Sequence, residues 1–213
     1  ALSGHRDRLG HVAFHPAGRL LGTACFDHAW RLWDLDTTSM LLLQDGHARE
    51  VYALDFHPDG SLCFTGDVAG VGLLWDLRSG KQILSCLGHS KKILAADFAV
   101  DGYMLATASD DNTVRVWDLR RKTTHYVLPA HSSLIADCKF APTSAEAIAT
   151  AAYDGQIALW STRDWSNLVL LQAHDGKAMS LDFAPPTVDN GPRPEASLVS
   201  AGFDRTFKLW NPA

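Results

Sequence analysis

Residues 88–118 read GHSKKILAADFAVDGYMLATASDDNTVRVWD, and variants of this stretch occur five times along the chain. In this copy a Gly-His pair opens the stretch and a Trp-Asp pair closes it, with 28 residues from His89 to Trp117. The opening histidine recurs at spacings of 42, 42, 42 and 43 residues, as His5, His47, His89, His131 and His174. Such a fixed period predicts one supersecondary unit per repeat, each packed against its neighbours.

Each repeat consists of short apolar runs separated by residues that favour turns. The second repeat holds the runs VYALDF, SLCFTG, VGLLW and KQILSCL, separated by HPDG, DVAG and DLRSG. Runs of this length and composition favour strands, whereas Gly, Pro and Asp clusters favour turns. No segment shows an apolar stripe of helical period over three turns. The sequence therefore predicts an all-β chain.

Composition narrows the classes of protein that fit. The chain has 213 residues, 46% of them hydrophobic, and no run of eighteen apolar residues that would predict a transmembrane helix. Its net charge of −5 argues against a polycation built for nucleic acid. Four cysteines lie far apart without a CxxC pair, which favours packed thiols over a disulfide or zinc framework. No phosphate loop, HExxH, GxSxG or metal-ligand spacing of histidines is present, so we expect no cofactor and no metal.

A histidine, a hydroxyl residue and an aspartate recur together and have two interpretations. In four repeats the hydroxyl residue stands four positions before the aspartate, as Thr107 and Asp111 do. These are the residue types of a hydrolase triad. An enzyme, however, needs one nucleophile beside one cleft and one oxyanion hole. A set that returns in every unit indicates a device that each unit needs in order to fold, so we predict no catalytic residue.

The second repeat breaks this pattern. Ala69 stands where the aspartate is expected, and Asp67 lies two residues earlier. Either Asp67 takes over the role, or the histidine is held through water. Nearby glycines permit an unusual turn. We expect this to be the least regular of the five units.

A period of 42 residues with Gly-His and Trp-Asp ends resembles the WD-repeat family, from about Gly4 to Trp210. The resemblance implies a β-propeller with one four-stranded blade per repeat, over residues of about 4–45, 46–87, 88–129, 130–172 and 173–213. It also implies that the recurring residues form a structural tetrad in each blade that includes the tryptophan. The tetrads are His5, Thr23, Asp27 and Trp33; His47, Thr65 and Trp75; His89, Thr107, Asp111 and Trp117; His131, Thr150, Asp154 and Trp160; and His174, Ser200, Asp204 and Trp210.

Phrases between the family positions carry a finer resemblance. FHPAGRLLGTACFDHAWRLWDL, SDDNTVRVWDLRRKTTHYVLPAH and AAYDGQIALWSTRDWSNLVLLQAHDGK resemble repeats of WD-repeat pre-mRNA splicing factors of the U4/U6 small nuclear ribonucleoprotein. This implies a nuclear scaffold whose partners are splicing proteins of that particle and of its assembly with U5, with any contact to U4/U6 RNA possible but indirect. The alternative is a substrate receptor of a cullin–RING ubiquitin ligase, because WDLR occurs at residues 75–78 and 117–120, or another WD-repeat adaptor.

Two sets of residues are candidates for partner contacts. In the family, the residue before the turn aspartate lies on the face formed by the histidine loops, and here Phe26, Tyr153 and Phe203 take that position. Aromatics gather at interface hot spots, although each ring can also lie over its own turn. The second set is basic and comprises Arg120, Arg121 and Lys122, on the opposite face. It suits RNA backbone or an acidic protein, or it is a solvated turn.

Two further expectations concern the C-terminal repeat and the whole ring. Residues 185–196 hold four prolines, which predicts an extended loop without a core of its own. The related propellers have seven blades, but five repeats are present here. We therefore expect these to be the last five blades of a seven-bladed ring.

Overall fold

Five small antiparallel sheets follow one another along the chain in the computed structural model, which describes residues 1–142, 146–184 and 197–211. We call each sheet a blade and number the blades from the N-terminus. The first four blades have four strands each, and the fifth shows three within the described residues. The strands are β1 (Leu9–Phe14), β2 (Leu20–Cys25), β3 (Trp30–Asp34) and β4 (Ser39–Gln44); β5 (Val51–Phe56), β6 (Leu62–Asp67), β7 (Gly72–Asp76) and β8 (Lys81–Cys86); β9 (Ile93–Phe98), β10 (Met104–Ser109), β11 (Val114–Asp118) and β12 (Thr123–Leu128); β13 (Ile135–Phe140), β14 (Ala147–Ala152), β15 (Gln156–Ser161) and β16 (Asn167–Gln172); and β17 (Ala178–Phe183), β18 (Leu198–Gly202) and β19 (Phe207–Trp210).

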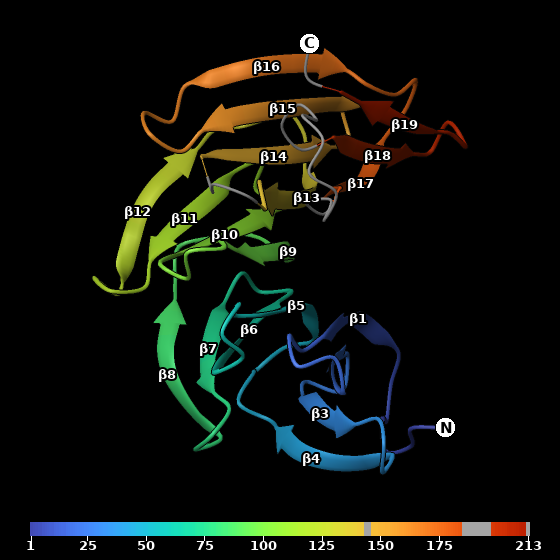
Figure 1. The fold of residues 1–213 in the computed structure, drawn as a ribbon, viewed down its shortest axis with the longest axis vertical. Helices are drawn as coiled ribbons and strands as arrows, with labels where there is room; N and C mark the ends of the chain where they lie inside the picture. Colours follow the sequence, from blue (N-terminus) through green and yellow to red (C-terminus); the bar gives the residue numbers. More distant parts are fainter. Residues whose placement is uncertain (143–145, 185–196, 212–213) are drawn as a thin grey trace, which may run out of the picture.

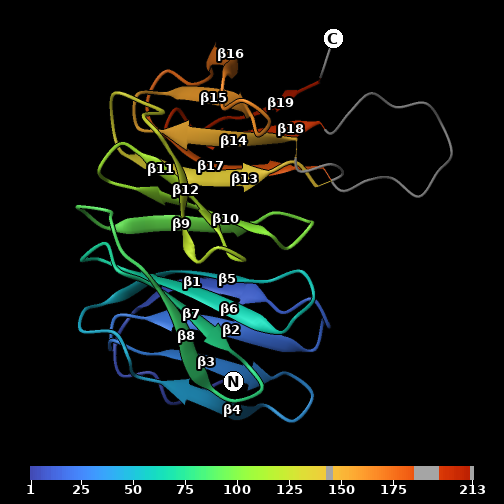
Figure 2. The ribbon, with the colours of Figure 1, turned by 90° about the vertical axis from the view of Figure 1, so that its left-hand side faces the viewer.

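The blades stand side by side in an open arc, with blade 1 and blade 5 at its two ends (Figure 1). The first strand of each blade lies innermost and contacts the first strand of the next, from β1 through β5, β9 and β13 to β17. In blades 1 to 4 the fourth strand lies on the outer rim. Seen from the side, the sheets are stacked one above another (Figure 2). The predictions of an all-β chain and of one blade per repeat are confirmed.

The hydrophobic core lies between the blades, in four separate layers. One layer joins blades 1 and 2, and the others join each later pair. The last residue of the inner strand is a phenylalanine that turns back onto the preceding blade. At blade 2 this is Phe56, and its ring lies so close to Gly22 that a Cβ there would come within 2.6 Å of it. Blades can therefore approach at that point only because residue 22 lacks a side chain.

Blade 2 is as regular as its neighbours, so the prediction that it would be the least regular is wrong. Its strands pair with the same register shifts as blade 1, between the first two strands and again at the repeat tryptophan. The change from Asp to Ala69 is accommodated by side chains without a change in the sheet. The proline-rich segment 185–196 lies outside the described residues. Within the described residues, no helix is long and apolar enough to cross a membrane.

The two end blades expose positions that are buried in the middle of the arc. Phe14 of blade 1 is 67% exposed, whereas Phe98 at the same place in blade 3 is 6% exposed. Phe207 of blade 5 is 78% exposed, whereas Val114 at its place in blade 3 is fully buried. Each of these side chains lies where a neighbouring blade covers its equivalent.

Candidate functional site

A histidine, a hydroxyl residue and a tryptophan are joined by hydrogen bonds inside each blade. In blade 3, His89 Nε2 lies 2.8 Å from Thr107 Oγ1, and Trp117 Nε1 donates to the same oxygen at 2.9 Å. His89 Nδ1 lies 2.8 Å from Asp111 Oδ2. The histidine comes from the loop before β9, the hydroxyl from β10, the carboxylate from the turn between β10 and β11, and the tryptophan from β11. One chain of hydrogen bonds thus ties two strands, a loop and a turn together.

Blade 2 builds the same chain with a different carboxylate. Asp67 Oδ2 lies 3.1 Å from His47 Nδ1, and His47 Nε2 lies 2.7 Å from Thr65 Oγ1. The other Asp67 oxygen accepts the N–H groups of Ala69 and Val71, both at 2.9 Å. Of the two alternatives for this repeat, the structure therefore places Asp67 at the histidine. In blade 5, the histidine, serine, aspartate and tryptophan occupy the expected places at 2.9 to 3.0 Å.

Blade 1 is organised differently, because the guanidinium of Arg31 takes part in its chain of hydrogen bonds. Arg31 Nη1 lies 3.1 Å from His5 Nδ1, and Arg31 also forms two hydrogen bonds to Asp27, at 3.1 and 2.7 Å. A guanidinium can only donate, so His5 Nδ1 must accept and the ring proton sits on Nε2, which donates to Thr23 at 3.1 Å. In blades 2, 3 and 5 the histidine faces a carboxylate, which only accepts, so its proton sits on Nδ1. Blade 1 carries the opposite tautomer.

Blade 4 holds its carboxylate most loosely. His131 Nε2 lies 2.8 Å from Thr150 Oγ1, and Trp160 Nε1 donates to that oxygen at 3.2 Å. His131 Nδ1 is 3.3 Å from Asp154 Oδ2, but the geometry is too poor for a hydrogen bond. The structure therefore brings the predicted residues together in every blade, with direct His–Asp hydrogen bonds in three of them.

Burial and hydrogen bonding shift the pKa values of these groups in opposite directions. Burial lowers the pKa of His5, His89 and His131, which favours the neutral rings that the chains require. Burial by itself raises the pKa of Asp111, but hydrogen bonds from Thr113 and His89 outweigh it and lower the value to about 2. At Asp27 the guanidinium of Arg31 has the same effect against burial, again lowering the pKa to about 2. These shifts keep Asp27 and Asp111 charged, and favour neutral rings at His5, His89 and His131, near pH 7.

These chains of hydrogen bonds are closed to ligands, because nearly all of their polar atoms already have hydrogen-bond partners; His131 Nδ1, which faces the Asp154 carboxylate, is the exception. The Thr23, Thr65, Thr107, Thr150 and Ser200 side chains are buried, and each accepts an indole N–H. In blade 1, His5, Cys25 and Asp27 bring possible metal-ligand atoms within 4.8 Å of one another. The Arg31 guanidinium already bonds to two of the three, so a cation would have to displace a buried positive charge. The arrangement suits a structural role better than catalysis or metal binding.

Two histidines, each directly after the first strand of its blade, join neighbouring blades. His15 Nε2 lies 2.8 Å from the carbonyl oxygen of Gly60, and His57 Nε2 lies 2.9 Å from that of Gly102. Gly60 and Gly102 have φ of 75° and 72°, and the histidine ring fills the space that a Cβ would need. We call these contacts the His latches. The sequence repeats the phrase FHPxG at residues 14–18 and 56–60, but it does not show which glycine of the next blade each histidine contacts.

Buried carboxylates on the inner strands make a second set of contacts between blades. Asp55 accepts the N–H of Phe98 at 3.0 Å, and Asp97 accepts the N–H of Phe140 at 2.7 Å. At the next junction Asp137 accepts the N–H of Leu181 at 3.0 Å. The repeat spacing missed this set, because the last aspartate sits two positions away from the register of the first two.

These carboxylates line the channel inside the arc and surround one lysine. A cavity of about 290 Å³ is lined by Asp55, Asp137, Asp182 and Lys139, among others. Lys139 Nζ lies 2.9 Å from Asp97 Oδ1. Burial, together with the nearby charge of Asp97, raises the pKa of Asp55 to about 7. Burial also raises the pKa of Asp97 and of Asp137. One cation thus faces several carboxylates that are reluctant to ionise.

The three predicted contact aromatics lie on the histidine-loop face, each close to a basic side chain. The Arg8 guanidinium carbon is 4.0 Å from the centre of the Phe26 ring. Lys177 Nζ lies 4.3 Å from the centre of the Tyr153 ring and 5.4 Å from that of Phe203. Tyr153 and Phe203 therefore form one cluster through Lys177, whereas Phe26 stands apart on blade 1. Phe203 is the most exposed of the three.

The predicted basic residues Arg120, Arg121 and Lys122 lie in the β11–β12 turn on the opposite face. Arg120 is held by Asp118 at 3.2 Å and lies over the Tyr103 ring at 4.4 Å. Arg121 is 3.7 Å from the same carboxylate and 76% exposed in its side chain, and Lys122 is exposed. The structure thus separates the two candidate sets, the aromatics at one end of the channel and the basic turn at the other.

Comparison with known proteins agrees with the repeat architecture. The family described as "WD domain, G-beta repeat" matches residues 1–34, 39–76, 80–118 and 122–161, which is more than half of the chain. The protein named "U4/U6 small nuclear ribonucleoprotein PRP4" from Saccharomyces cerevisiae is 49% identical over 45 residues. That match covers 21% of this chain and 10% of the yeast protein. With five sheets of the expected topology and a repeated His–hydroxyl–Trp chain, this protein belongs to the WD40-repeat family.

Proposed function

We propose that the protein is a non-catalytic interaction scaffold that acts in pre-mRNA splicing, as part of the U4/U6 small nuclear ribonucleoprotein and its assembly with U5. The observation that carries this proposal is the 49% identity over 45 residues to the yeast U4/U6 protein, together with a buried hydroxyl in every blade that already accepts an indole N–H. Rigid blades of this kind present loops at the two ends of a channel. Such a scaffold acts in the nucleus.

The exposed aromatic and basic cluster on the histidine-loop face is the proposed contact surface for protein partners. Phe203, Tyr153 and Lys177 come from blades 4 and 5 and lie within reach of one another. A cavity of about 190 Å³ opens beside Tyr153 and Tyr52. Exposed rings beside a shallow hollow are typical of interface hot spots, because they bury a large area at a low cost in conformational entropy.

The alternative of a ubiquitin-ligase receptor rested on two WDLR phrases, and the structure gives these residues other roles. Trp75 and Trp117 donate to the buried hydroxyls of Thr65 and Thr107. Asp76 and Asp118 accept N–H groups of their own turns, and Arg120 is held against Asp118 and Tyr103. These contacts account for the phrases as strand and turn chemistry.

Affinity purification of the full-length parent protein tests the proposal. We expect splicing proteins with U4 and U6 RNA to co-purify, whereas recovery of a cullin adaptor without them would contradict it. A variant with Phe26, Tyr153 and Phe203 all changed to Ser is expected to lose protein partners while it keeps its melting temperature within a few degrees. If a folded triple variant retains every partner, the contact surface lies elsewhere on the protein.

A further inference from the structure

The rim where blade 3 meets blade 4 carries an aromatic stack. The Tyr126 ring on β12 and the Trp165 ring from the β15–β16 turn lie 5.3 Å apart, with only 12° between their planes. His125 meets the Trp165 ring in an edge-on contact at 5.7 Å. Trp165 is 9% exposed, whereas Tyr126 is 40% exposed. One face of the Tyr126 ring is therefore covered by Trp165, and the other is open to solvent.

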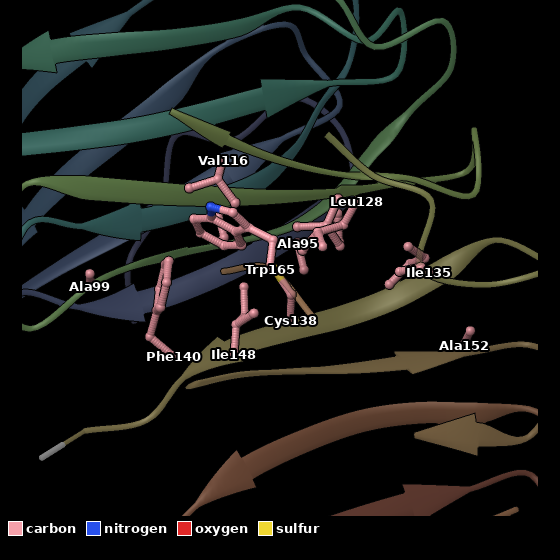
Figure 3. Close-up of a cluster of buried hydrophobic side chains, with 14 residues drawn as sticks. Ala95, Ala99, Val116, Leu128, Ile135, Cys138, Phe140, Ile148, Ala152 and Trp165 are labelled. Atoms are coloured by element: carbon pink, nitrogen blue, oxygen red, sulfur yellow. The ribbon is translucent and has the colours of Figure 1, made fainter. Parts of the chain in front are cut away.

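The backbone at Trp165 adopts a conformation that is unfavourable for a residue with a large side chain. Trp165 has φ of 60°, in the left-handed region that favours glycine. The same turn position in blades 1 to 3 is filled by Thr38, Gly80 and Lys122. The Trp165 ring packs against Val116 and Leu128 of blade 3 and beside Phe140 of its own blade (Figure 3). The ring under Tyr126 is thus fixed in a core and does not swing with a mobile loop.

A basic turn leads directly into the strand that carries Tyr126. Residues 118–122 contain one carboxylate, Asp118, and three cations, Arg120, Arg121 and Lys122, for a net charge of +2. The Asp118 carboxylate is used by two N–H groups of the turn and by the guanidinium of Arg120. Arg121 and Lys122 are left exposed on the same turn. Positive charge and an open ring face therefore lie on one short segment, residues 118–126.

We propose that this segment binds single-stranded RNA, with a base stacked on the open face of Tyr126 and phosphates beside Arg121 and Lys122. A flat aromatic face next to exposed cations fits a base with its phosphate, because every base has a π-face and carries one negative charge beside it. An acidic protein segment would use the cations but would gain little from a rigid, parallel pair of rings. The charge is local, so binding is confined to this rim of a chain that is acidic as a whole.

This proposal goes beyond the scaffold function, because it requires direct contact between this chain and nucleic acid. A scaffold can join splicing proteins without touching RNA, so the two proposals fail independently. Binding is therefore measured with the purified chain and a synthetic RNA alone.

Fluorescence anisotropy of a labelled oligouridylate of about twelve nucleotides is the direct test, titrated with the full chain at low salt. The key variant is Tyr126→Leu, which keeps the strand intact because Leu42 and Leu84 hold this register position in blades 1 and 2. We expect Tyr126→Leu to weaken binding about tenfold and Tyr126→Phe to retain it. The double change Arg121→Gln and Lys122→Gln is expected to weaken binding and to flatten its dependence on salt.

Arg78→Gln is the matched control, since Arg78 is an exposed arginine in the corresponding turn of blade 2. It is expected to leave RNA affinity unchanged. The proposal is overturned if the folded wild-type chain gives no anisotropy change, or if Tyr126→Leu binds as tightly as wild type. It is also overturned if a polyglutamate peptide displaces the RNA at equal charge concentration, which would assign the segment to an acidic protein.

Discussion

At the scale of single residues, the five polar chains show that the same motif need not carry the same protons. His47, His89 and His174 each present Nδ1 to a carboxylate, whereas His5 presents Nδ1 to the Arg31 guanidinium. A carboxylate needs a donor opposite it and a guanidinium needs an acceptor, so the position of the ring proton follows from the partner. The sequence could not reveal this difference, because Arg31 stands in an otherwise ordinary repeat.

The tautomers are directly observable. We expect the 15N spectrum of the histidine rings near pH 7 to show His5 with its proton on Nε2 and His47, His89 and His174 with theirs on Nδ1. Arg31→Leu, which copies Leu73 of blade 2, is expected to move the His5 proton to Nδ1. A shared proton position in all four rings of the wild-type chain would contradict this assignment of hydrogen bonds.

The hydroxyl at the centre of each chain of hydrogen bonds should contribute more to the free energy of unfolding than a single hydrogen bond does. Thr65 is fully buried and serves both His47 and Trp75. Thr65→Val keeps the shape but leaves two buried groups without a partner, so we expect the free energy of unfolding to fall by about 3 kcal/mol. Urea denaturation measures this loss. Thr123→Val on the exposed end of β12 is the control and should change stability by less than about 0.5 kcal/mol.

At the scale of strands and sheets, the junctions between blades depend on charged side chains that the repeat pattern did not predict. Asp55, Asp97 and Asp137 each accept an N–H from the inner strand of the next blade. Their side chains line the channel in a low-dielectric setting, so the ionised forms are disfavoured. These carboxylates should therefore lower stability as pH rises, whereas the charged carboxylates of Asp27 and Asp111 should lower it as pH falls.

The pKa shifts give the sign of each effect. The pKa of Asp55 is about 7 in the fold, above its unfolded value, so its stabilising contribution is complete below that unfolded value and is lost as pH rises through 7. The pKa values of Asp27 and Asp111 are lowered to about 2, so their contribution is present above the unfolded value and is lost as pH falls towards 2. We expect maximal stability between roughly pH 4 and 6.

Asp55→Asn tests the alkaline side of this profile. The amide oxygen can still accept the N–H of Phe98, while the group no longer ionises. We expect urea midpoints of the variant to change less between pH 6 and pH 8 than those of wild type, with the acidic side unaltered. Asp36→Asn, at an exposed turn, is the control. An unchanged alkaline slope in Asp55→Asn would assign the pH dependence to other groups.

The strands and their order could be predicted from the sequence, but the contacts between blades could not. Period-2 apolar runs and Gly-Pro-Asp turns are local signals, so VYALDF and SLCFTG led directly to β5 and β6. The hydroxyl and tryptophan of each chain also lay at fixed spacings. The His latches, the Arg31 insertion and the Tyr126–Trp165 stack depend on which residues meet from different repeats. The spacing of residues within one repeat does not predict these contacts between repeats.

At the scale of the whole molecule, the arc ends in two surfaces built like its interior. Phe14 and Phe207 are exposed at positions whose equivalents are covered by a neighbouring blade. We therefore propose that further blades cover both ends of the arc in a larger ring. In the 213-residue chain, Phe14→Ser should cost less than about 0.5 kcal/mol of stability.

The same substitution inside the arc gives the contrast that tests this expectation. Phe98→Ser removes a buried ring and should cost about 3 to 5 kcal/mol, measured by chemical denaturation. In a parent chain that supplies a preceding blade, Phe14→Ser should become nearly as costly as Phe98→Ser. If Phe14→Ser remains neutral in the longest available chain, no blade covers it.

The latches and carboxylates between blades all point in one direction along the chain. His15 and His57 reach forward to the next blade, and so do Asp55, Asp97 and Asp137. During translation, N-terminal units leave the ribosome first. Each finished blade then already displays these side chains to its successor, which meets them with backbone N–H and C=O groups and, at the last two junctions, also with the side chains of Lys139 and Ser180. The arc is thus suited to assemble in the order of its synthesis, one blade acting as the template for the next.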